Sequence, residues 1–247
     1  MEMRCSLRIE MRSFFYYDHL DSTMNEYLRL KEINPEPICV RAGTQNDGVG
    51  RGDHVWISPP GGLWFTFDLV ATNPTASFAL FTGYCLHHCL GSLFHPLKDD
   101  LKIKWTNDII YAGKKLGGIL CRYQSVKKIY TIGVGLNTNN DIDSGLGKFG
   151  AVSLKQILGF EVSNSFLCRA LIKGVEGECN KRSSSVNYLT YCNDQLFGRG
   201  RWARIEISGL EITAEILGID ANGYLLVRKE MGEYISVHTG SIIDFVD

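Results

Sequence analysis

The chain has 247 residues, with 26 basic and 27 acidic side chains and a formal net charge of −1 at neutral pH. Hydrophobic residues make up 45% of the chain and charged residues 21%, a balance that excludes an intrinsically disordered chain. The length allows one full hydrophobic core and a small second unit. The even charge argues against non-specific nucleic-acid binding, which needs a basic face, but it leaves a local basic site open.

The 8 cysteines form no Cys-x-x-Cys pair. Cys85 and Cys89 bracket two histidines in an apolar stretch, where a helix would place both thiols on one face. A metal site there stays open, but two small apolar side chains of a buried helix are the favoured interpretation. No run has the length of a signal peptide or a membrane span, which predicts a reducing, cytoplasmic setting. Arg4, Arg8 and Arg12 leave a mitochondrial presequence as the second alternative.

The first two thirds of the chain alternate between helical and strand patterns. A helix over 22–33 opens with a capping-box pattern at Thr23 and ends before Pro35. A glycine-rich loop is expected over 43–62, and an Asn-, Asp- and Gly-rich mobile loop over 138–150. Further helices are expected over 75–95, 151–158, 163–182 and 186–196. Strands are expected over 37–42, 63–70, 101–106, 108–112, 115–123 and 128–137.

The pattern changes near residue 198. From Trp202 onward come five short alternating runs separated by turn residues, and Asn222-Gly223 is a strong hairpin signal. Five short strands in about fifty residues predict a small antiparallel barrel. We therefore expect two domains, a catalytic domain over 1–197 and a small β-barrel domain over 198–247.

The loop from Gly43 to Trp56 is the first segment with candidate chemistry. Its glycines let the backbone approach a ligand closely, Arg51 supplies a fixed cation and Trp56 a flat apolar face. Asp53 stands where the third glycine of the dinucleotide fingerprint belongs, and the P-loop pattern is absent. An ordinary surface turn with a packed tryptophan stays open on composition alone.

Two later segments add cations and amides. Residues 102–108 read Lys-Ile-Lys-Trp-Thr-Asn-Asp, residues 113–120 read Gly-Lys-Lys-Leu-Gly-Gly-Ile-Leu, and residues 133–140 carry three asparagines after a glycine-rich strand. Each alone also fits a solvated strand face. Together they offer cations without an obvious protein nucleophile, which is typical of chemistry on a phosphate ester, where positioning and charge neutralisation dominate.

The order of these motifs resembles the biotin–protein ligases of the holocarboxylase synthetase type. The resemblance covers residues 21–247 and rests on Asp21-Ser22-Thr23, on Gln45 through Trp56, on Lys-Trp-Thr-Asn-Asp-Ile followed by Lys-Leu-Gly-Gly-Ile-Leu, and on Gly-Val-Gly-Leu-Asn. It implies an α+β fold with a central mixed sheet flanked by helices, a class II synthetase-like catalytic domain. The C-terminal domain is then expected to be an SH3-like β-barrel.

The resemblance implies a two-step reaction. The carboxylate of biotin attacks the α-phosphate of MgATP to give biotinyl-5′-AMP, and a lysine of a biotin carboxyl carrier domain then takes the biotinyl group. ATP, Mg²⁺ and biotin are the expected substrates and cofactors, and the carrier domain of a carboxylase is the expected protein partner. No nucleic-acid or membrane partner is expected, and a homodimer stays open.

The resemblance also implies roles for single residues. The expected catalytic residues are Arg51, Lys104, Asn107, Asp108 and Lys115. The expected biotin contacts are Ser22, Thr23, Met24, Gln45, Val49, Gly50, Arg51, Lys115, Gly117 and Gly118. The expected adenylate contacts are Arg51, Trp56, Lys104, Asn107 and Asn137. Asp108 is the expected magnesium contact, by way of the phosphates.

Three departures from the family pattern stand out. The common loop reads Gly-Arg-Gly-Arg-x-Gly-Arg, whereas Val49 replaces its first arginine and Asp53-His54 its final Gly-Arg. Thr106 stands where proline is usual, which should alter only the local backbone. We expect His54 to pack in the loop or face a partner rather than act as a base.

Two other functions stay open beside this one. A lipoate or octanoate ligase would share the fold, but its Arg-Arg-x-Ser-Gly-Gly-Gly stretch is missing. A non-catalytic sensor of biotin or biotinyl-AMP would not need Arg51 and Lys115. About twenty residues precede Asp21, too few for a helix-turn-helix domain, so we expect the form of the ligase without DNA binding.

Overall fold

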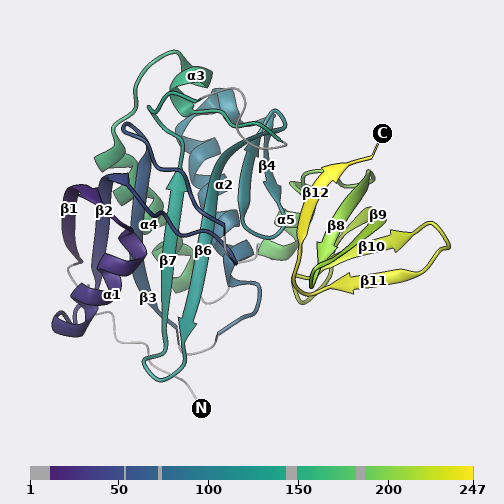
Figure 1. Cartoon of the computed structure of the whole chain (residues 1–247), viewed down its shortest axis with the longest axis horizontal. Helices are drawn as coiled ribbons and strands as arrows, with labels where there is room; N and C mark the ends of the chain where they lie inside the picture. Colours follow the sequence, from purple (N-terminus) through teal and green to yellow (C-terminus); the bar gives the residue numbers. More distant parts are fainter. Residues whose placement is uncertain (1–11, 53, 72–73, 143–148, 182–186, 247) are drawn as a thin grey trace.

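The computed structural model describes residues 12–52, 54–71, 74–142, 149–181 and 187–246, which form two sheets with helices around the larger one (Figure 1). The larger sheet contains β1 (Ser13–Leu20), β2 (Ile38–Gln45), β3 (Leu63–Val70), β4 (Leu101–Lys104), β5 (Asp108–Tyr111), β6 (Lys114–Gln124) and β7 (Ile129–Leu136). Its strand order is β1-β2-β3-β7-β6-β5-β4. Only β1 and β2 pair in parallel, so the predicted mixed sheet is confirmed.

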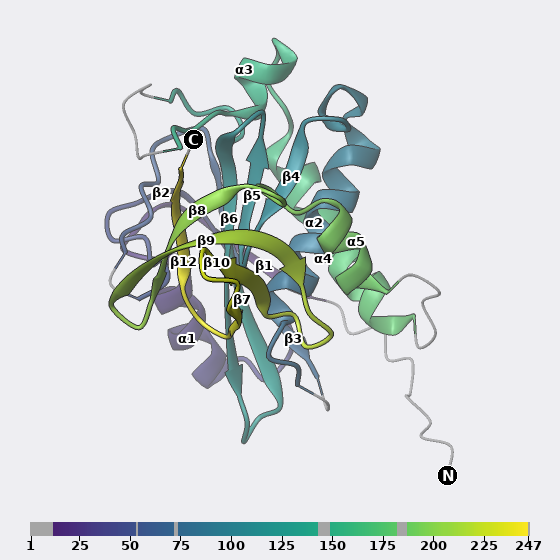
Figure 2. The ribbon, with the colours of Figure 1, turned by 90° about the vertical axis from the view of Figure 1, so that its right-hand side faces the viewer.

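Helices cover both faces of this sheet, as Figure 2 shows. The helices are α1 (Thr23–Ile33), α2 (Phe78–Leu93), α3 (Leu154–Leu158), α4 (Asn164–Asn180) and α5 (Tyr188–Asp194), with a short 3₁₀ turn at His95–Leu97. Alternation along β2 separates the two faces. Ile38 and Val40 pack with Tyr27 of α1, whereas the Sγ of Cys39 lies 3.9 Å from the Sγ of Cys168 on α4.

The main core lies between the sheet and α2, α4 and α5. Helix α2 is apolar on most sides, with Leu80, Leu86 and Leu90 almost fully buried, because it lies between the sheet and α4. Cys85 belongs to the same core and Cys89 packs against it. Both are therefore small apolar side chains of a largely buried helix, as we expected. No helix in the described ranges is long and apolar enough to cross a membrane.

The smaller sheet is antiparallel throughout. It contains β8 (Trp202–Ile207), β9 (Leu210–Ile219), β10 (Leu225–Lys229), β11 (Tyr234–Val237) and β12 (Ser241–Phe245), in the order β11-β10-β9-β8-β12. Gly223 has a φ of 87°, which the predicted Asn-Gly turn between β9 and β10 requires. This sheet is consistent with an SH3-like barrel. The domain boundary at residue 198 stays a prediction, and it falls between α5 and β8.

Strand β1 has no counterpart among the predicted elements. Its sequence carries aromatic side chains on both faces, so it lacks the alternation of polar and apolar residues that marks a strand. Phe15 and Tyr17 pack against α1, while Phe14 and Tyr16 are exposed on the other face. The guanidinium groups of Arg169 and Arg41 lie 3.9 Å and 4.6 Å from the ring centroids of Phe14 and Tyr16.

The other elements differ from the prediction mainly at their ends. β2 continues three residues past 42, so the glycine-rich loop starts later than expected. The helix expected over 75–95 spans Phe78–Leu93, and the one expected over 151–158 spans Leu154–Leu158. Several predictions lie partly or wholly outside the described residues: Arg4, Arg8, Asp53, the loop segment 143–148 and the segment 182–186.

A single tryptophan joins the two sheets. Trp105 follows β4, and its Nε1 donates a hydrogen bond of 3.0 Å to the carbonyl of Gly223 in the β9–β10 turn. Its ring belongs to the core of the smaller sheet together with Leu225 and Val227. Next to it, the backbone of Ile103 bonds to Gln195 and Phe197. The strand that carries Lys104 is therefore tied directly to the C-terminal sheet.

The buried imidazole of His87 makes folding stability pH-dependent. The ring nitrogen Nε2 donates a hydrogen bond of 3.0 Å to the carbonyl of Leu101. The other nitrogen, Nδ1, lies 2.8 Å from the hydroxyl of Tyr191 and accepts from it in the neutral imidazole. Burial lowers the pKa of His87. Below about pH 6.5 the unfolded chain takes up a proton that the folded chain does not, and the free energy of unfolding falls.

We expect His87→Asn to cost about 1–3 kcal/mol at pH 7.5, because it leaves a buried carbonyl or hydroxyl without its partner. The same substitution should weaken the loss of stability between pH 6.5 and 5. Urea unfolding across this range measures both effects. His88→Asn, on the exposed side of α2, is the matched control and should keep the wild-type pH dependence; an equal change in both variants would contradict the role of His87.

Candidate active site

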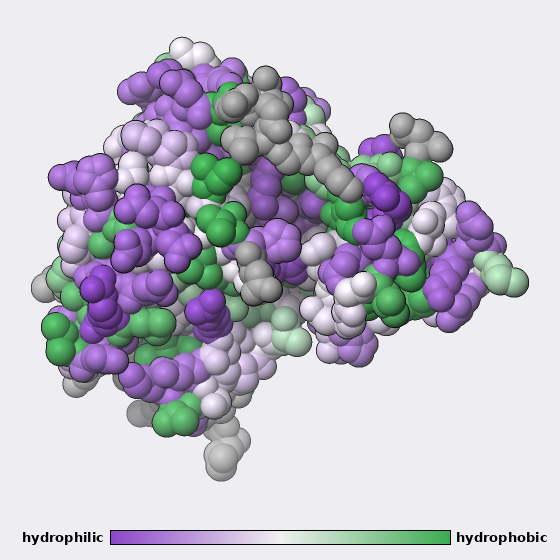
Figure 3. Space-filling view, viewed as in Figure 1, coloured by the Kyte–Doolittle hydropathy of each residue, from purple (hydrophilic) through white to green (hydrophobic). Residues whose placement is uncertain are grey.

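The residues predicted to form the site come together on the face of the larger sheet that α1 covers. β2 leads into the glycine-rich loop, β4 and β5 bring in the Lys-Trp-Thr-Asn-Asp segment, and β6 and β7 contribute glycines and Lys115. Figure 3 shows this side of the molecule with hydrophobic side chains in small groups between hydrophilic ones. The site is therefore built from stretches that lie far apart in the chain.

A buried polar network occupies one end of the site. Ser22 caps α1, accepting from the backbone N–H of Met24 at 3.2 Å. Gln45 Oε1 accepts from both the backbone N–H and the hydroxyl of Thr23, at 2.8 Å and 3.0 Å. Thr66 on β3 donates to the Thr23 hydroxyl at 2.9 Å, and Gln45 Nε2 donates to Ser58 at 2.7 Å. Two of the expected biotin contacts, Thr23 and Gln45, thus form one set of donors and acceptors, and Ser22 lies beside them at the start of α1.

The glycine-rich loop folds back on itself as a hairpin. The backbone N–H of Trp56 donates to the carbonyl of Gly48 at 2.7 Å, and that of Gly50 donates to His54 at 2.8 Å. A Cβ at Gly48 would lie 2.3 Å from the Trp56 carbonyl oxygen, and one at Gly50 would lie 2.6 Å from that of His54. Only glycine permits this close approach. Val49 bridges to the loop's return strand.

His54 takes part in this hairpin. Its ring Nδ1 lies 3.1 Å from the carbonyl oxygen of Arg51, and the side chain is exposed. The imidazole is therefore within hydrogen-bonding distance of the loop backbone, the role that we expected for it.

Two glycines form a floor under Trp56. A Cβ at Gly135 on β7 would lie 2.3 Å from the indole, and a Cβ at Gly118 on β6 would lie 2.7 Å from it. Trp64 meets Trp56 edge to face, with ring centroids 6.3 Å apart. The indole Nε1 of Trp56 is buried and has no hydrogen-bond partner in the described ranges. The ring is thus held over a glycine surface by packing and ring contacts, without a hydrogen bond from its Nε1 to any described residue.

Two lysines share one carboxylate beside this indole. Asp108 Oδ1 lies 2.9 Å from Lys115 Nζ, and Asp108 Oδ2 lies 4.0 Å from Lys104 Nζ. Lys115 Nζ is 4.9 Å from the Trp56 ring centroid, and Lys104 Nζ is 4.1 Å from that of Phe149. Burial, together with the charges of Lys115 and Arg51, lowers the pKa of Lys104 to about 8, and Asp108 opposes that shift.

Arg51 approaches the same place from the loop but does not contact Asp108 directly. Its guanidinium donates to Thr106 Oγ1 at 2.9 Å, to Ser241 Oγ at 2.8 Å and to the carbonyl of Gly240 at 3.1 Å. Two of these three acceptors belong to the C-terminal sheet. A small cavity of about 160 Å³ lies beside Arg51 and Thr106, between the two sheets.

Three of the expected contacts face the protein instead of the open site. Asn107 Nδ2 donates to the carbonyl of Ile119 at 2.8 Å, and Asn137 Nδ2 donates to that of Lys115 at 3.3 Å. Strand alternation turns Gly117 away from Trp56, toward Leu136. These residues fix the backbone that carries Lys115 and Gly118, and their contacts to substrate stay a prediction.

Four side chains of the site were not predicted from the sequence: Ser58, Thr66, Phe149 and Ser241. Thr66 lies inside an apolar strand, where a threonine is usually read as a β-branched strand former. Phe149 and Ser241, the first residue of β12, lie far along the chain and acquire their role only through tertiary packing. For Thr66, the hydroxyl inside an otherwise apolar run was the feature of the sequence that could have indicated a site residue.

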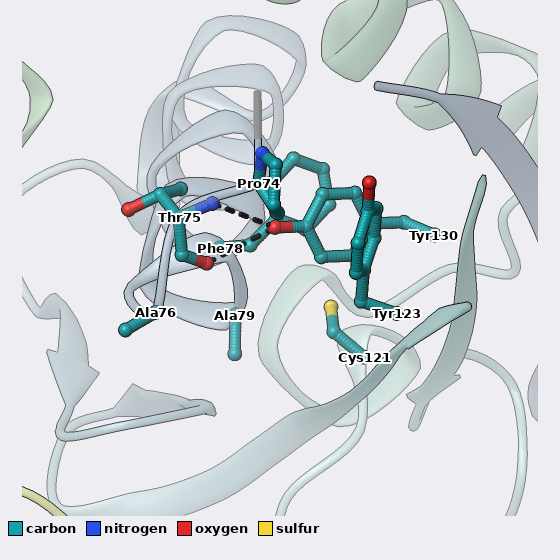
Figure 4. A pocket seen from close by; sticks show the side chains of 8 residues that line it. All are labelled: Pro74, Thr75, Ala76, Phe78, Ala79, Cys121, Tyr123 and Tyr130. Atoms are coloured by element: carbon teal, nitrogen blue, oxygen red, sulfur yellow. Dashed lines mark hydrogen bonds between the residues drawn. The ribbon is translucent and has the colours of Figure 1, made fainter. Parts of the chain in front are cut away.

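A larger cavity of about 390 Å³ lies elsewhere, between the start of α2 and the ends of β6 and β7 (Figure 4). The hydroxyl of Tyr130 donates to the carbonyl of Thr75 at 3.0 Å and accepts from its backbone N–H at 2.8 Å. Phe78 stacks on the Tyr130 ring. Among the described residues that line this cavity, none is charged and none belongs to the predicted site.

We expect Gly135→Ala to displace Trp56 from its floor, because the added methyl would overlap the indole. The overpacking should cost about 1–3 kcal/mol of stability and increase acrylamide quenching of tryptophan fluorescence. Gly177→Ala is the control, since that glycine on α4 has open space around it. When both proteins also carry Trp56→Phe, the difference in quenching between the Gly135→Ala variant and the protein with Gly135 should disappear. A persistent difference would show that another tryptophan moves.

The chain matches the family model described as the biotin/lipoate A/B protein ligase family over residues 16–139, half of its length. This range begins in β1 and ends after β7, so it holds the larger sheet, the loop hairpin and all three site cations. The C-terminal sheet lies beyond it.

Two curated proteins and one solved structure illustrate the similarity. The bifunctional ligase/repressor BirA of Bacillus subtilis is 28% identical over 94% of this chain and 74% of its own length. Biotin–protein ligase 2 of Arabidopsis thaliana is 34% identical, over 44% of this chain and 35% of its own length. The biotin protein ligase of Aquifex aeolicus, solved with biotin and ATP, has the same fold: TM-score 0.78, 23% identity, 95% of this chain and 97% of that one.

Proposed function

Because the chain belongs to the biotin/lipoate A/B protein ligase family and is a biotin–protein ligase, we propose that it works through biotinyl-5′-AMP and modifies one lysine of a biotin carboxyl carrier domain. The observation that carries this proposal is the convergence of three cations on one place: Lys104 and Lys115 share the carboxylate of Asp108, and the charge of Arg51 acts on Lys104. Such a site has an excess of positive charge, which suits a reaction between two anions.

Recognition of biotin is the proposed task of the polar network. The ureido group of biotin has one carbonyl and two N–H groups. The hydroxyls of Ser22 and Thr23 and the amide of Gln45 can donate to the carbonyl and accept from the N–H groups. Because Thr23 and Gln45 hold each other in place and Ser22 is fixed by capping α1, little conformational entropy is lost when the ligand binds.

In the first step, a carboxylate oxygen of biotin attacks the α-phosphorus of ATP, the bond to the bridging oxygen breaks and pyrophosphate leaves. Carboxylate and phosphate repel each other, and nearby cations lower that barrier. Lys115 stands at the mouth of the site with a third of its side chain exposed, where it can reach the reacting oxygens. Lys104, which is more buried, is placed for the phosphates that lie deeper.

In the second step, the uncharged ε-amine of the carrier lysine attacks the acyl carbon and AMP leaves. The competing nucleophile is water, so the intermediate has to be shielded. Trp56 and the hairpin that carries it form a cover over the glycine floor. Opening and closing of this cover would admit the carrier lysine and exclude solvent.

Magnesium enters this proposal only as the counterion of ATP. Among the described residues there is no group of three His, Cys, Asp or Glu side chains that could hold a metal ion. Asp108, the expected contact, is already paired with Lys115. The described side chains do not form a metal site of the protein's own, so Mg²⁺ would enter the site bound to the phosphates of ATP.

We also propose a reducing, cytoplasmic compartment and no nucleic-acid partner. The seven cysteines within the described ranges are free thiols, which supports a reducing compartment.

The deciding experiment is incubation with biotin, MgATP and a carrier domain. Mass spectrometry should show one biotinyl group on one lysine, and rapid quenching should trap biotinyl-AMP. Lipoate in place of biotin tests the related ligase activity, and single-turnover transfer of preformed biotinyl-AMP tests for a sensor. No mass gain beside an active control ligase would overturn the proposal, and so would preference for lipoate.

We expect Lys115→Ala to slow biotin-dependent exchange of pyrophosphate into ATP on the order of a hundredfold or more, the loss typical of one charge stabiliser. Lys155→Ala is the matched control, because Lys155 lies on the surface in an ion pair with Glu161. Wild-type exchange by the Lys115 variant would remove this lysine from the reaction.

We expect ATP binding to take up protons through Lys104. Its pKa of about 8 leaves the amine about half neutral at pH 8, and an adjacent phosphate favours the charged form. Binding at pH 8 should therefore take up about 0.5 proton, and less at pH 6.5 where the amine is already charged. Isothermal titration in two buffers with different ionisation enthalpies measures this number. Lys104→Arg should bind ATP without the uptake, and unchanged uptake would contradict the assignment.

A further inference from the structure

The three cations of the site are held in two different ways. Lys115 and Lys104 share the carboxylate of Asp108, whereas the hydrogen-bond acceptors of Arg51 are two hydroxyls and a backbone carbonyl. Within the described ranges no carboxylate lies within 4 Å of the Arg51 guanidinium. Neutral acceptors fix the position of a guanidinium without cancelling its charge, so the charge remains available to an anion.

Two of these acceptors come from the start of β12, far along the chain. Ser241 pairs with Glu206 of β8 in the sheet, which sets the direction of its hydroxyl. A Cβ at Gly240 would lie 2.3 Å from the Glu206 carbonyl oxygen, so the backbone is packed closely there and its carbonyl is fixed as well. The acceptor pair is part of a rigid sheet edge and not of a free tail.

The same sheet is anchored on the strand that carries Lys104. Trp105, the next residue, is buried in the core of the smaller sheet and donates to Gly223. The residue after it, Thr106, is the third acceptor of Arg51. Arg51 is therefore fixed relative to Lys104 by two routes, one through the β4–β5 turn and one through β12.

From this geometry we propose that Ser241 is a positioning residue for Arg51. It holds the only arginine of the loop hairpin, which pairs with no carboxylate of the described residues, against the reaction site, and so keeps the hairpin closed over the activated intermediate. The proposal rests on the proposed function and gives the C-terminal sheet a part in it: control of how long biotinyl-AMP stays bound. Hydrogen bonds that a neutral protein group makes to a charged one are strong enough for this task.

The site has a particular need for this support. In the segment from Asn46 to Ser58, Arg51 is the only arginine and no lysine occurs. With Val49 and His54 at the positions where the family pattern has cations, a single side chain carries the charge that orders the loop around phosphate. Loss of its hydroxyl partner should therefore act on retention of the intermediate before it acts on its formation.

The test compares Ser241→Ala with wild type in a chase experiment. The protein forms biotinyl-AMP from labelled biotin and MgATP, excess unlabelled biotin is added, and the retained label is followed with time. We expect release about three- to tenfold faster than wild type, because one of three hydrogen bonds to the guanidinium is lost. Biotinylation of bystander proteins should rise in parallel, and the thermal midpoint of unfolding should stay unchanged.

Three further variants separate positioning from a structural effect. Ser236→Ala removes a hydroxyl from the same sheet, bonded to Asp220 and not to Arg51, and should release the intermediate at the wild-type rate. Ser241→Thr keeps a hydroxyl and should restore retention. Arg51→Ala should be as fast as the Ser241→Ala/Arg51→Ala double variant, because Ser241 acts only through Arg51.

The outcomes are distinct. If Ser241→Ala releases the intermediate at the wild-type rate, or if the effects of the two substitutions add in the double variant, the role of Ser241 is overturned. The proposed function still stands in that case, provided that the protein exchanges pyrophosphate into ATP. Absence of pyrophosphate exchange and of biotinyl-AMP in the wild-type protein overturns the proposed function and the positioning role with it.

Discussion

The structure depends on holding three like charges together in a partly buried place. Arg51, Lys104 and Lys115 repel one another, and only Asp108 is close enough to two of them to offset that repulsion. Two unit charges 4 Å apart interact by about 4 kcal/mol at an effective dielectric constant near 20. Burial lowers the pKa of Lys104 to about 8, and the charges of Lys115 and Arg51 act in the same direction. A fold that keeps such a cluster has to be stabilised elsewhere.

That stabilisation comes from the segment between β4 and β5. Lys104 points into the site, Trp105 is buried in the core of the smaller sheet, and Thr106 accepts from Arg51. Three consecutive residues thus connect the catalytic face, the second core and the loop hairpin. Because Trp105 directly follows Lys104 in the chain, the free energy gained by burying the tryptophan also holds the charged lysine in place.

The sequence was sufficient for whatever a local pattern determines. The helix that starts at Thr23 and the turn at Gly223 follow from local patterns, and both are present, although the cap is Ser22 and not the capping box predicted at Thr23. The hairpin in the glycine-rich loop was not predicted, because its glycines were assigned to the approach of a ligand and not to the close approach of the loop's own two arms. β1 could not be predicted, because it has aromatic residues on both faces and so shows no alternation. The arginines that lie against its outer aromatic rings come from other elements of the chain. Ser241 could not be predicted either, because nothing near a serine in a short strand indicates an arginine about 190 residues away.

The two ways of holding a cation have different consequences when an anion arrives. A phosphate that approaches Lys115 competes with Asp108, so part of its attraction is offset by the ion pair that it weakens. A phosphate that approaches Arg51 meets a charge held by hydroxyls and a carbonyl, and it need displace no carboxylate. Arg51 can therefore respond to charge that appears during the reaction, while the Lys115–Asp108 pair keeps the site stable before the substrates bind. This division places the adjustable part of the site in the loop and its support in the C-terminal sheet.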